Sequence, residues 1–200
     1  MRAEFVAADQ PHGTNVAVVR TANRGRGALD PATAFTDVDA LVTRERGAML
    51  LCFSADCPSI VLFDPARRVV AAAHSGWRGT VGGIAWKAIR RMQEEFACRA
   101  DDLLACIGPG IAPCCFEVGS DVVLAVEQRM PLAKEFITLR DGRTYFDIAS
   151  TIRKQVLEAG VAASRIESAN VCTFCRVDEF FSYRAESGRT GRFATVVGLR

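Results

Sequence analysis

Three short apolar runs in the first half of the chain constrain its fold more than any other feature. The runs span residues 48–53, 59–63 and 69–73, and the pair Asp64-Pro65 marks a turn between the last two. Each run is too short for a typical helix and is apolar at both odd and even positions. Such runs are typical of buried strands, so we expect these segments to lie inside a sheet.

Helical patterns follow these runs. The clearest covers residues 80–96, where apolar side chains recur at helical spacing and charged side chains lie on the opposite side. Weaker patterns cover residues 120–128 and residues 148–159, the second closed by Gly160 as a C-cap. Three helices are therefore predicted.

Further strand patterns lie before, between and after these helices. They cover residues 16–19, 103–107, 168–174 and 193–199, with a hairpin turn at Asp141-Gly142. Because strands arrive in groups, the pattern favours an α+β fold with a large mixed sheet and flanking helices over a strictly alternating βαβ fold. A chain of 200 residues without a repeat or a clear linker is expected to form one domain over residues 1–200.

Composition excludes several classes of partner. The chain has 25 Lys and Arg against 23 Asp and Glu, a formal net charge of +2, and no basic run longer than a pair. Bulk charge therefore predicts neither nucleic-acid binding nor membrane binding. The sequence shows no signal-peptide pattern and no apolar run of the roughly 18 residues that a spanning helix needs, so we expect a cytoplasmic protein. The eight cysteines are then expected to be reduced thiols.

The two histidines of the chain are candidate metal ligands. His12 precedes a predicted strand, and His74 directly follows the run 69–73. A lone histidine at a strand end is usually structural, but Cys57 lies at a third strand boundary, between a polar and a turn-forming residue. Two imidazoles and one thiolate match a zinc site whose fourth position is open to water or substrate. The same donors also suit copper.

A glycine-rich turn, residues 75–83, connects His74 to the predicted helix. Amides at a helix N-terminus, together with the guanidinium of Arg78, would suit a phosphate group. The alternative is a tight strand-to-helix turn with Trp77 packed in the core. The sequence does not choose between these two interpretations.

Two pairs of cysteines are interpreted as structural. Cys172 and Cys175 form a C-x-x-C unit, but the chain has neither a second such unit nor a spare histidine to complete a tetrahedral site. Cys114 and Cys115 are adjacent, and neighbouring cysteines do not easily form a disulfide with each other. We predict buried packing for both pairs in preference to a metal or redox role.

Several motifs, taken together, resemble one family. It is known as the YfiH or laccase-domain proteins, as multicopper polyphenol oxidase-like proteins and, more recently, as purine nucleoside phosphorylases. The motifs occur in the family's order over nearly the whole chain. The resembling residues are Gln10-Pro11-His12-Gly13, Ala55-Asp56-Cys57, Ala73-His74-Ser75-Gly76-Trp77-Arg78-Gly79, the segment from Gly108 to Gly119, Cys172-Thr173-Phe174-Cys175, Phe180-Phe181-Ser182-Tyr183-Arg184 and Thr190-Gly191-Arg192.

The resemblance implies a fold, a metal and an activity. The fold would be of the YfiH type, an α+β architecture shared with a group of proposed cysteine hydrolases. The zinc ligands would be His12, Cys57 and His74. The activity would be phosphorolysis of adenosine, inosine, guanosine and methylthioadenosine to the base and ribose 1-phosphate, with adenosine deamination as a second activity. The expected partners are therefore a purine nucleoside and phosphate.

This activity suggests roles for individual residues. Asp56 is a candidate for orienting a ligand histidine. Arginines would hold phosphate, and the leaving purine would need a proton donor or a hydrogen-bonding partner. The expected catalytic residues are Cys57, His74, Asp56 and Arg78. The expected substrate-binding residues are Arg78, Arg184 and Arg192, of which the last two lie in an aromatic and arginine-rich segment suited to bases and anions.

The chain departs from the family pattern in three places. Family members usually carry a longer segment before the first motif, including an arginine implicated in ligand binding. The chain starts too late to contain that segment, so either the true start lies upstream or the pocket is more open. Pro11 replaces a residue that is commonly apolar, and Pro58 follows the candidate ligand Cys57. Both prolines could alter the orientation of a ligand.

Three other functions compete with phosphorolysis. A copper-dependent phenol oxidase is disfavoured, because two histidines supply ligands for at most one copper site. A hydrolase that edits cell-wall precursors would use Cys57 or a metal-bound water to attack an amide. A non-catalytic zinc protein could bind nucleosides or a protein partner.

Overall fold

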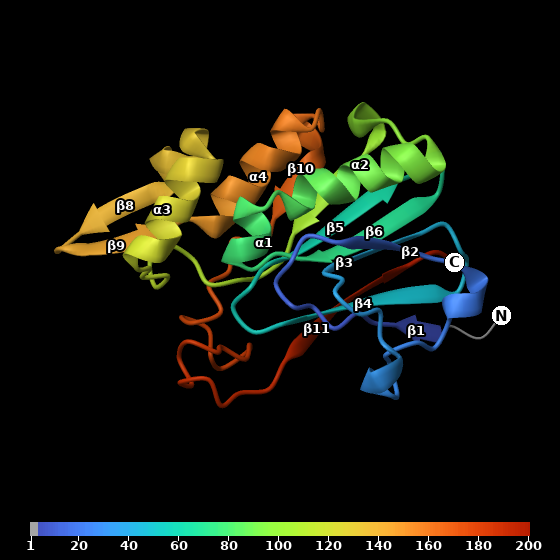
Figure 1. Cartoon of the computed structure of the whole chain (residues 1–200), viewed down its shortest axis with the longest axis horizontal. Coiled ribbons are helices and arrows are strands. Elements are labelled where there is room, and N and C mark those ends of the chain that lie inside the picture. The colour runs from blue at the N-terminus through green and yellow to red at the C-terminus, as the bar shows by residue number, and fades with distance from the viewer. Residues whose placement is uncertain (1–3) are drawn as a thin grey trace.

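The computed structural model describes residues 4–200, which form two sheets, a hairpin and four α-helices (Figure 1). Short 3-10 turns lie between some of these elements. The strands are β1 (Glu4–Val6), β2 (Val16–Val19), β3 (Ala40–Thr43), β4 (Ala48–Ser54), β5 (Ser59–Asp64), β6 (Val69–His74), β7 (Leu104–Ile107), β8 (Ile137–Arg140), β9 (Arg143–Phe146), β10 (Ile166–Ser168) and β11 (Phe193–Gly198). The helices are α1 (Trp77–Val81), α2 (Ile84–Phe96), α3 (Ser120–Arg129) and α4 (Ile148–Glu158).

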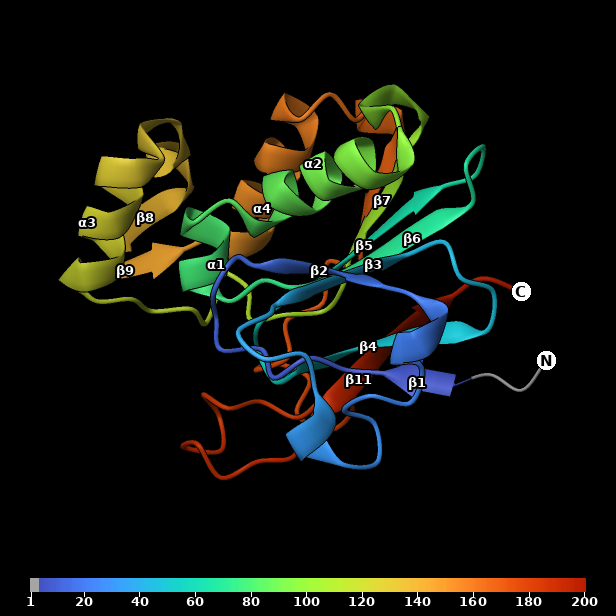
Figure 2. The same cartoon turned by 45° about the vertical axis from the view of Figure 1, so that its right-hand side comes forward.

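The larger sheet has six strands in the order β10-β7-β5-β6-β3-β2. Its outer pairs are parallel and its inner pairs are antiparallel, so the sheet is mixed. The smaller sheet has the order β1-β4-β11. Strands β8 and β9 form a separate hairpin beside α3 (Figures 1 and 2). The predicted α+β class with a large mixed sheet is confirmed.

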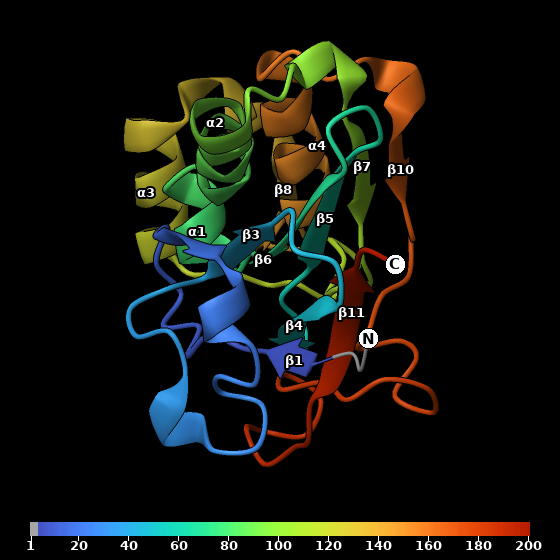
Figure 3. The same ribbon diagram turned by 90° about the vertical axis from the view of Figure 1, so that its right-hand side faces the viewer.

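The central strands β3 and β6 of the six-stranded sheet are buried on both faces. Helices α2 and α4 lie over one face and the three-stranded sheet lies under the other, an arrangement that Figures 2 and 3 show from two further directions. In β6, every residue is buried. Alternate side chains serve different layers: Val69, Ala71 and Ala73 join the core under the helices, whereas Val70 and Ala72 join the core between the sheets. This double burial explains why the run has no polar face.

Most of the predicted elements are present, but two are wrong in extent. The helix predicted over 80–96 is broken at Gly82 and Gly83, and Gly83 has φ of 80°, a conformation that favours glycine. The strand predicted over 168–174 ends at Ser168, because Asn170 takes φ of 53° and turns the chain out of the sheet. Strands β1 and β3 were not predicted, since three or four residues give too little periodicity. Among residues 4–200, every helix is too short or too polar to cross a lipid bilayer.

Candidate metal centre

The candidate ligands lie near one end of the central strands of the six-stranded sheet. His74 is the last residue of β6, and its antiparallel neighbour β5 begins with Ser59 directly opposite it. Cys57 lies two residues before β5, and Asp39 lies immediately before β3, the other neighbour of β6. Because the end of one antiparallel strand meets the start of the next, residues far apart in the sequence lie together here.

The structure brings together His12, Cys57 and His74, as the sequence predicted. Their candidate ligand atoms all lie within 4.8 Å of one another, and the two imidazole rings are 4.7 Å apart between centroids. His74 is buried, Cys57 is partly buried and His12 is exposed. Gly76 gives them room, since a Cβ atom there would lie 2.7 Å from Cδ2 of His12 and 3.0 Å from Sγ of Cys57.

Hydrogen bonds to β4 hold the loop that carries His12 in place. Gln10 makes two 2.8 Å hydrogen bonds with the backbone of Phe53 on β4, donating through Nε2 to the carbonyl and accepting through Oε1 from the amide. His12 itself has φ of 68°, in the left-handed region that few non-glycine residues adopt. Such backbone strain is found where surrounding structure fixes a residue, and here it aims the imidazole at Cys57 and His74.

Asp39 connects the two histidines. Its side chain is fully buried, and Oδ1 accepts hydrogen bonds from Nδ1 of His74 at 2.9 Å and from the His12 amide at 3.0 Å. Oδ2 accepts from the amide of Gly13 at 2.6 Å. Because a carboxylate only accepts, Nδ1 of His74 carries a proton, and Nε2 is the nitrogen that can bind a metal once its own proton is displaced. A carboxylate in this position is the usual orienting partner of a metal-bound histidine.

The neighbouring side chains also shift the pKa values of Cys57 and His74. Burial alone would raise the pKa of the Cys57 thiol, but hydrogen bonds to His12 and His74 lower the pKa to about 7. Burial alone would lower the pKa of His74, but its hydrogen bonds to Asp39 and Cys57 raise the pKa to about 9. Cys57 is thus ionised to a large extent, about half, at neutral pH, and the thiolate is the form that binds metals.

This set of donors fits a soft or borderline transition metal. Two imidazole nitrogens and one sulfur are three of the four ligands of a tetrahedral zinc site, and no further Cys, Asp, Glu or His of residues 4–200 belongs to the group. The fourth direction is available because His12, Cys57 and His74 all line a cavity. The geometry is therefore that of a centre that can bind an exchangeable ligand.

The cavity has a volume of about 510 Å³, within the range of small-molecule sites. Arg78, Arg184 and Arg192 line the same cavity. The guanidinium of Arg78 lies over the ring of Trp77 at 4.2 Å from its centroid, which leaves its N–H groups free to meet an anion. Trp77 packs partly into the core, so this turn supports the core as well as lining the pocket.

Asp56 lines the cavity but makes different contacts from those expected. We expected it to orient a histidine, and Asp39 makes that contact instead. The Asp56 carboxylate accepts hydrogen bonds from Thr173 Oγ1, Ser182 Oγ and the Arg184 amide, each at 2.7 Å. Asp56 therefore holds the C-terminal loop, and with it Arg184, against the pocket. Sequence reasoning missed Asp39, whose only signal is an acidic residue directly before an unrecognised strand.

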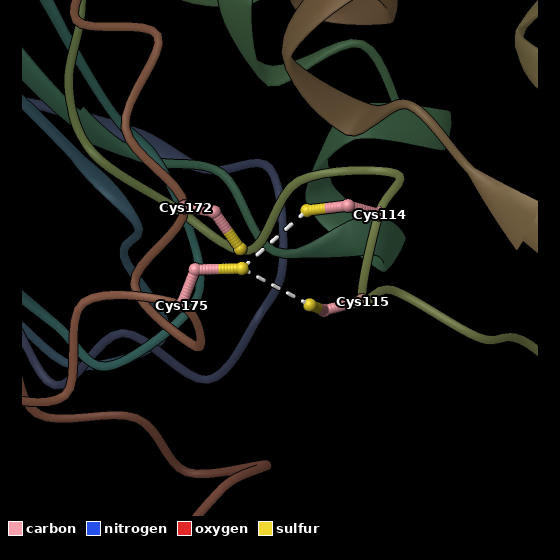
Figure 4. A group of neighbouring side chains, drawn as sticks. All are labelled: Cys114, Cys115, Cys172 and Cys175. Atoms are coloured by element: carbon pink, nitrogen blue, oxygen red, sulfur yellow. Dashed lines mark hydrogen bonds between the residues drawn. The ribbon is translucent and has the colours of Figure 1, made fainter.

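A second group of potential ligands lies outside this cavity (Figure 4). The sulfur atoms of Cys114, Cys115, Cys172 and Cys175 all lie within 4.8 Å of one another. Cys114 and Cys175 are exposed, and the other two are half-buried. The prediction of two separate, buried pairs is therefore wrong, because two distant loops meet at this point of the fold.

Comparison with known proteins places the whole chain in one family. A family model described as multi-copper polyphenol oxidoreductase laccase matches residues 1–200. The chain belongs to this family. The resemblance inferred from the motifs is thereby confirmed.

Relatives within the laccase family carry two enzyme names. Purine nucleoside phosphorylase YlmD of Geobacillus stearothermophilus is 38% identical, and the match covers 98% of this chain and 72% of the relative. Adenosine deaminase RL5, from an unknown prokaryotic organism, is 35% identical, with 94% of this chain and 73% of the relative covered.

A solved structure shares the family's mixed α+β fold. The crystal structure of the hypothetical protein YfiH from Bacillus licheniformis superposes with a TM-score of 0.93 at 33% sequence identity. The superposition covers 98% of this chain and 74% of that one. The large mixed sheet and the few helices described above are therefore the fold of this family.

Proposed function

We propose that the chain is a zinc-dependent purine nucleoside phosphorylase. The observation that carries this proposal is a single cavity that contains both an incomplete ligand set, His12, Cys57 and His74, and three arginine side chains. A reaction between a neutral nucleoside and a phosphate dianion is favoured by groups that bind the anion and by groups that stabilise the charge developing on the leaving purine. The name of the relative YlmD, purine nucleoside phosphorylase, supports the same activity.

The candidate zinc ligands are Nε2 of His74, an imidazole nitrogen of His12 and Sγ of Cys57. When bound, zinc would supply a Lewis acid at the base of the cavity. Asp39 would keep the His74 ring in one tautomer and one orientation, through the hydrogen bond to Nδ1. Copper could occupy the same donors, but the chain's two histidines fall short of the ligands that a multicopper oxidase needs.

The arginines would bind phosphate, and the aromatic side chains would bind the purine. Arg78, Arg184 and Arg192 would hold phosphate through charge-assisted hydrogen bonds. Phe116 and Tyr183 also line the cavity and offer flat faces on which a purine can stack. The guanidinium of Arg184 lies over the Phe116 ring at 5.5 Å, so the phosphate-binding and base-binding sides of the pocket adjoin.

Phosphorolysis exchanges one bond for another. A phosphate oxygen forms a bond to C1′ of the ribose, the bond from C1′ to the purine nitrogen breaks, and the purine accepts a proton. The products are the free base and ribose 1-phosphate. The proposed substrates are adenosine, inosine, guanosine and methylthioadenosine. Side chains that hold phosphate in line with C1′ lower the barrier by fixing the two reactants together.

Adenosine deamination is the second candidate activity, favoured by the name of one relative. Water would replace the amino group of adenosine to give inosine and ammonia, and phosphate would not be needed. The two activities are therefore separated by their products and by their dependence on phosphate.

The decisive experiment follows base release from adenosine and inosine with and without phosphate. We expect release only with phosphate, formation of ribose 1-phosphate in equal amount, and loss of both in Cys57→Ala. The matched control is Cys106→Ala, which removes a thiol on β7 outside the cavity. Base release without phosphate, or release that persists in Cys57→Ala, contradicts the proposal.

A further inference from the structure

Four cysteines from two distant parts of the sequence meet at one point on the surface. Cys114 and Cys115 belong to the loop between β7 and α3, and Cys172 and Cys175 belong to the loop between β10 and β11. All four sulfur atoms point toward a common space (Figure 4). None of the four lines the cavity described above, so this group is separate from the His12, Cys57 and His74 site.

The sulfur atoms are spaced as ligands of one metal ion would be. Four sulfurs at 2.3 Å from a central zinc ion in a tetrahedron lie about 3.8 Å from one another. Here Cys175 Sγ lies 3.7 Å from Cys114 Sγ and 3.4 Å from Cys115 Sγ, and all four sulfurs are within 4.8 Å. A disulfide would join only two of the four sulfurs, and Cys175 Sγ lies at a similar distance from two possible partners.

The backbone explains how each loop supplies two sulfurs on the same side. Cys172 and Cys175 have the C-x-x-C spacing of zinc sites and lie on a turn in which the amide of Arg176 donates to the carbonyl of Cys172. Cys114 and Cys115 are adjacent, and adjacent side chains on a strand would point apart. They lie instead on a turn, where the amides of Cys115 and Phe116 both donate to the carbonyl of Ala112 at 2.9 Å.

We propose that Cys114, Cys115, Cys172 and Cys175 bind a second, structural zinc ion. Four thiolates complete the tetrahedral coordination of zinc, so this site has no position for substrate. Binding releases the thiol protons to solvent and leaves the zinc with four thiolate ligands. The proposal does not depend on the reaction proposed for the cavity.

Two neighbouring groups suit thiolate ligands. The amide of Ala112 donates to Sγ of Cys172 at 3.4 Å, and such outer hydrogen bonds stabilise the negative charge of a ligand sulfur. The guanidinium of Arg140 donates to the carbonyl of Cys114 at 3.1 Å, which places a positive charge beside the group. A zinc ion with four thiolates carries a net negative charge, which this cation offsets.

The proposed zinc would join two loops that form the wall of the cavity. The loops already exchange backbone hydrogen bonds, from the Gly110 amide to Val171 and from the Thr173 amide to Gly110. Phe116, just after the adjacent cysteines, and Tyr183 and Arg184, after the C-x-x-C unit, line the cavity. A zinc ion between the loops would therefore fix the relative position of these side chains.

Metal analysis of purified protein tests the proposal directly. We expect about two zinc ions per chain in the unmodified protein, about one in Cys57→Ala, about one in Cys175→Ser and none in the double variant. Cys106→Ser is the matched control, because it removes a thiol outside both groups, and it should keep about two zinc ions. If Cys57→Ala contains no zinc, or if Cys175→Ser contains as much zinc as the unmodified protein, the proposal is wrong.

Two further measurements need only the unmodified protein. Alkylation after unfolding with a chelator and without reductant should modify all eight cysteines, whereas two unmodified cysteines would show a disulfide and overturn the proposal. Replacement of the bound metal by cobalt should give thiolate-to-cobalt charge-transfer absorption for five sulfur ligands per chain, four of them at this site. Absorption that matches the single ligand Cys57, or iron as the native metal, would also contradict a zinc site here.

Discussion

His74 ends a sheet strand and Cys57 lies just before another, with His12 on a loop beside them, whereas the four cysteines lie on two irregular loops. Neighbouring strands of the six-stranded sheet fix His74 opposite Ser59, which lies two residues after Cys57. The four cysteines depend on two turns and a few hydrogen bonds between loops. The first group is therefore preorganised by the fold, and the second gains its order from whatever joins its sulfur atoms.

The two groups also differ in the number of ligands and in what surrounds them. The strand-end group has three ligands, an orienting carboxylate from Asp39 and a cavity lined by arginines. The loop group has four thiols and lies outside that cavity. Three ligands beside a cavity suit a centre that acts on a substrate, and four ligands suit a centre that stabilises structure. The predictions below test this division.

The largest expected effect is that of Cys57→Ala. Without the thiolate, the pocket loses one of three ligands, and we expect phosphorolysis to fall by at least roughly the 10²- to 10³-fold that removal of one transition-state group costs. Steady-state rates and metal content measure the effect. Cys175→Ser is the comparison: it should lower the thermal unfolding midpoint and cost far less activity. Equal losses of activity in both variants would show that the division of roles is wrong.

The next largest effect is expected for Asp39→Asn. Asparagine offers one acceptor oxygen and an NH₂ group, so one of the three donors that now reach Asp39 would meet another donor. Loss of such an orienting partner typically weakens metal binding or activity by about 10- to 100-fold. Competition with a chelator measures the zinc affinity of the pocket.

The control for this variant is Asp37→Asn, two residues earlier. Its exposed carboxylate accepts from Asn15 rather than from a candidate ligand. The zinc affinity of the pocket should stay unchanged in Asp37→Asn. An equal weakening in both variants would mean that Asp39 acts through its charge alone and not by orienting His74.

The contrast between the two groups also shows what the sequence could predict. His12, Cys57 and His74 were identifiable because histidine is rare in this chain and because each residue borders a predicted strand. Strand β6 was identifiable as an apolar run because it is buried at every position, and β4 and β5 were identifiable because apolar side chains also occupy their partly exposed positions. These are local properties, and local properties can be read from a short stretch of sequence.

The four-cysteine group and Asp39 could not be predicted for the opposite reason. Each cysteine pair alone is an incomplete site, and the two pairs meet only through the arrangement of two loops. Asp39 precedes β3, whose four residues are too few to show a period. Contacts between segments far apart in the sequence depend on tertiary structure, which no local pattern records.

A smaller effect is expected for Arg78→Gln. This variant tests whether an arginine beside the three-ligand group binds phosphate, a role that the four-cysteine group does not have. A hydrogen bond to a charged group contributes about 1.5–3 kcal/mol, so the KM for phosphate should rise roughly tenfold or more, with little change in the KM for nucleoside. The control is Arg189→Gln, in the same exposed C-terminal loop as Arg184 but outside the cavity lining. An increase in the KM for nucleoside alone would show that Arg78 binds the nucleoside and not phosphate.

The smallest effect on activity is expected for Thr173→Val, at a residue whose hydrogen bond connects the C-x-x-C unit to the neighbour of Cys57. Thr173 lies inside the C-x-x-C unit, is fully buried, and donates at 2.7 Å to Asp56, the neighbour of Cys57. Valine has a similar shape but cannot donate, so the free energy of unfolding should fall by about 1.5–3 kcal/mol, as measured by denaturant titration. We expect both zinc ions to remain bound, with only a small change in rate.

Ser182→Ala is the matched comparison, because Ser182 donates to the same oxygen of Asp56 from outside the C-x-x-C unit. If the two groups are independent, both variants should lose similar stability and keep the pocket metal. If Thr173→Val releases the pocket metal and Ser182→Ala does not, the hydroxyl of Thr173 transmits order from the cysteine group to Cys57. The two groups would then be one coupled unit, and the division between a catalytic and a structural centre would fail at this hydrogen bond.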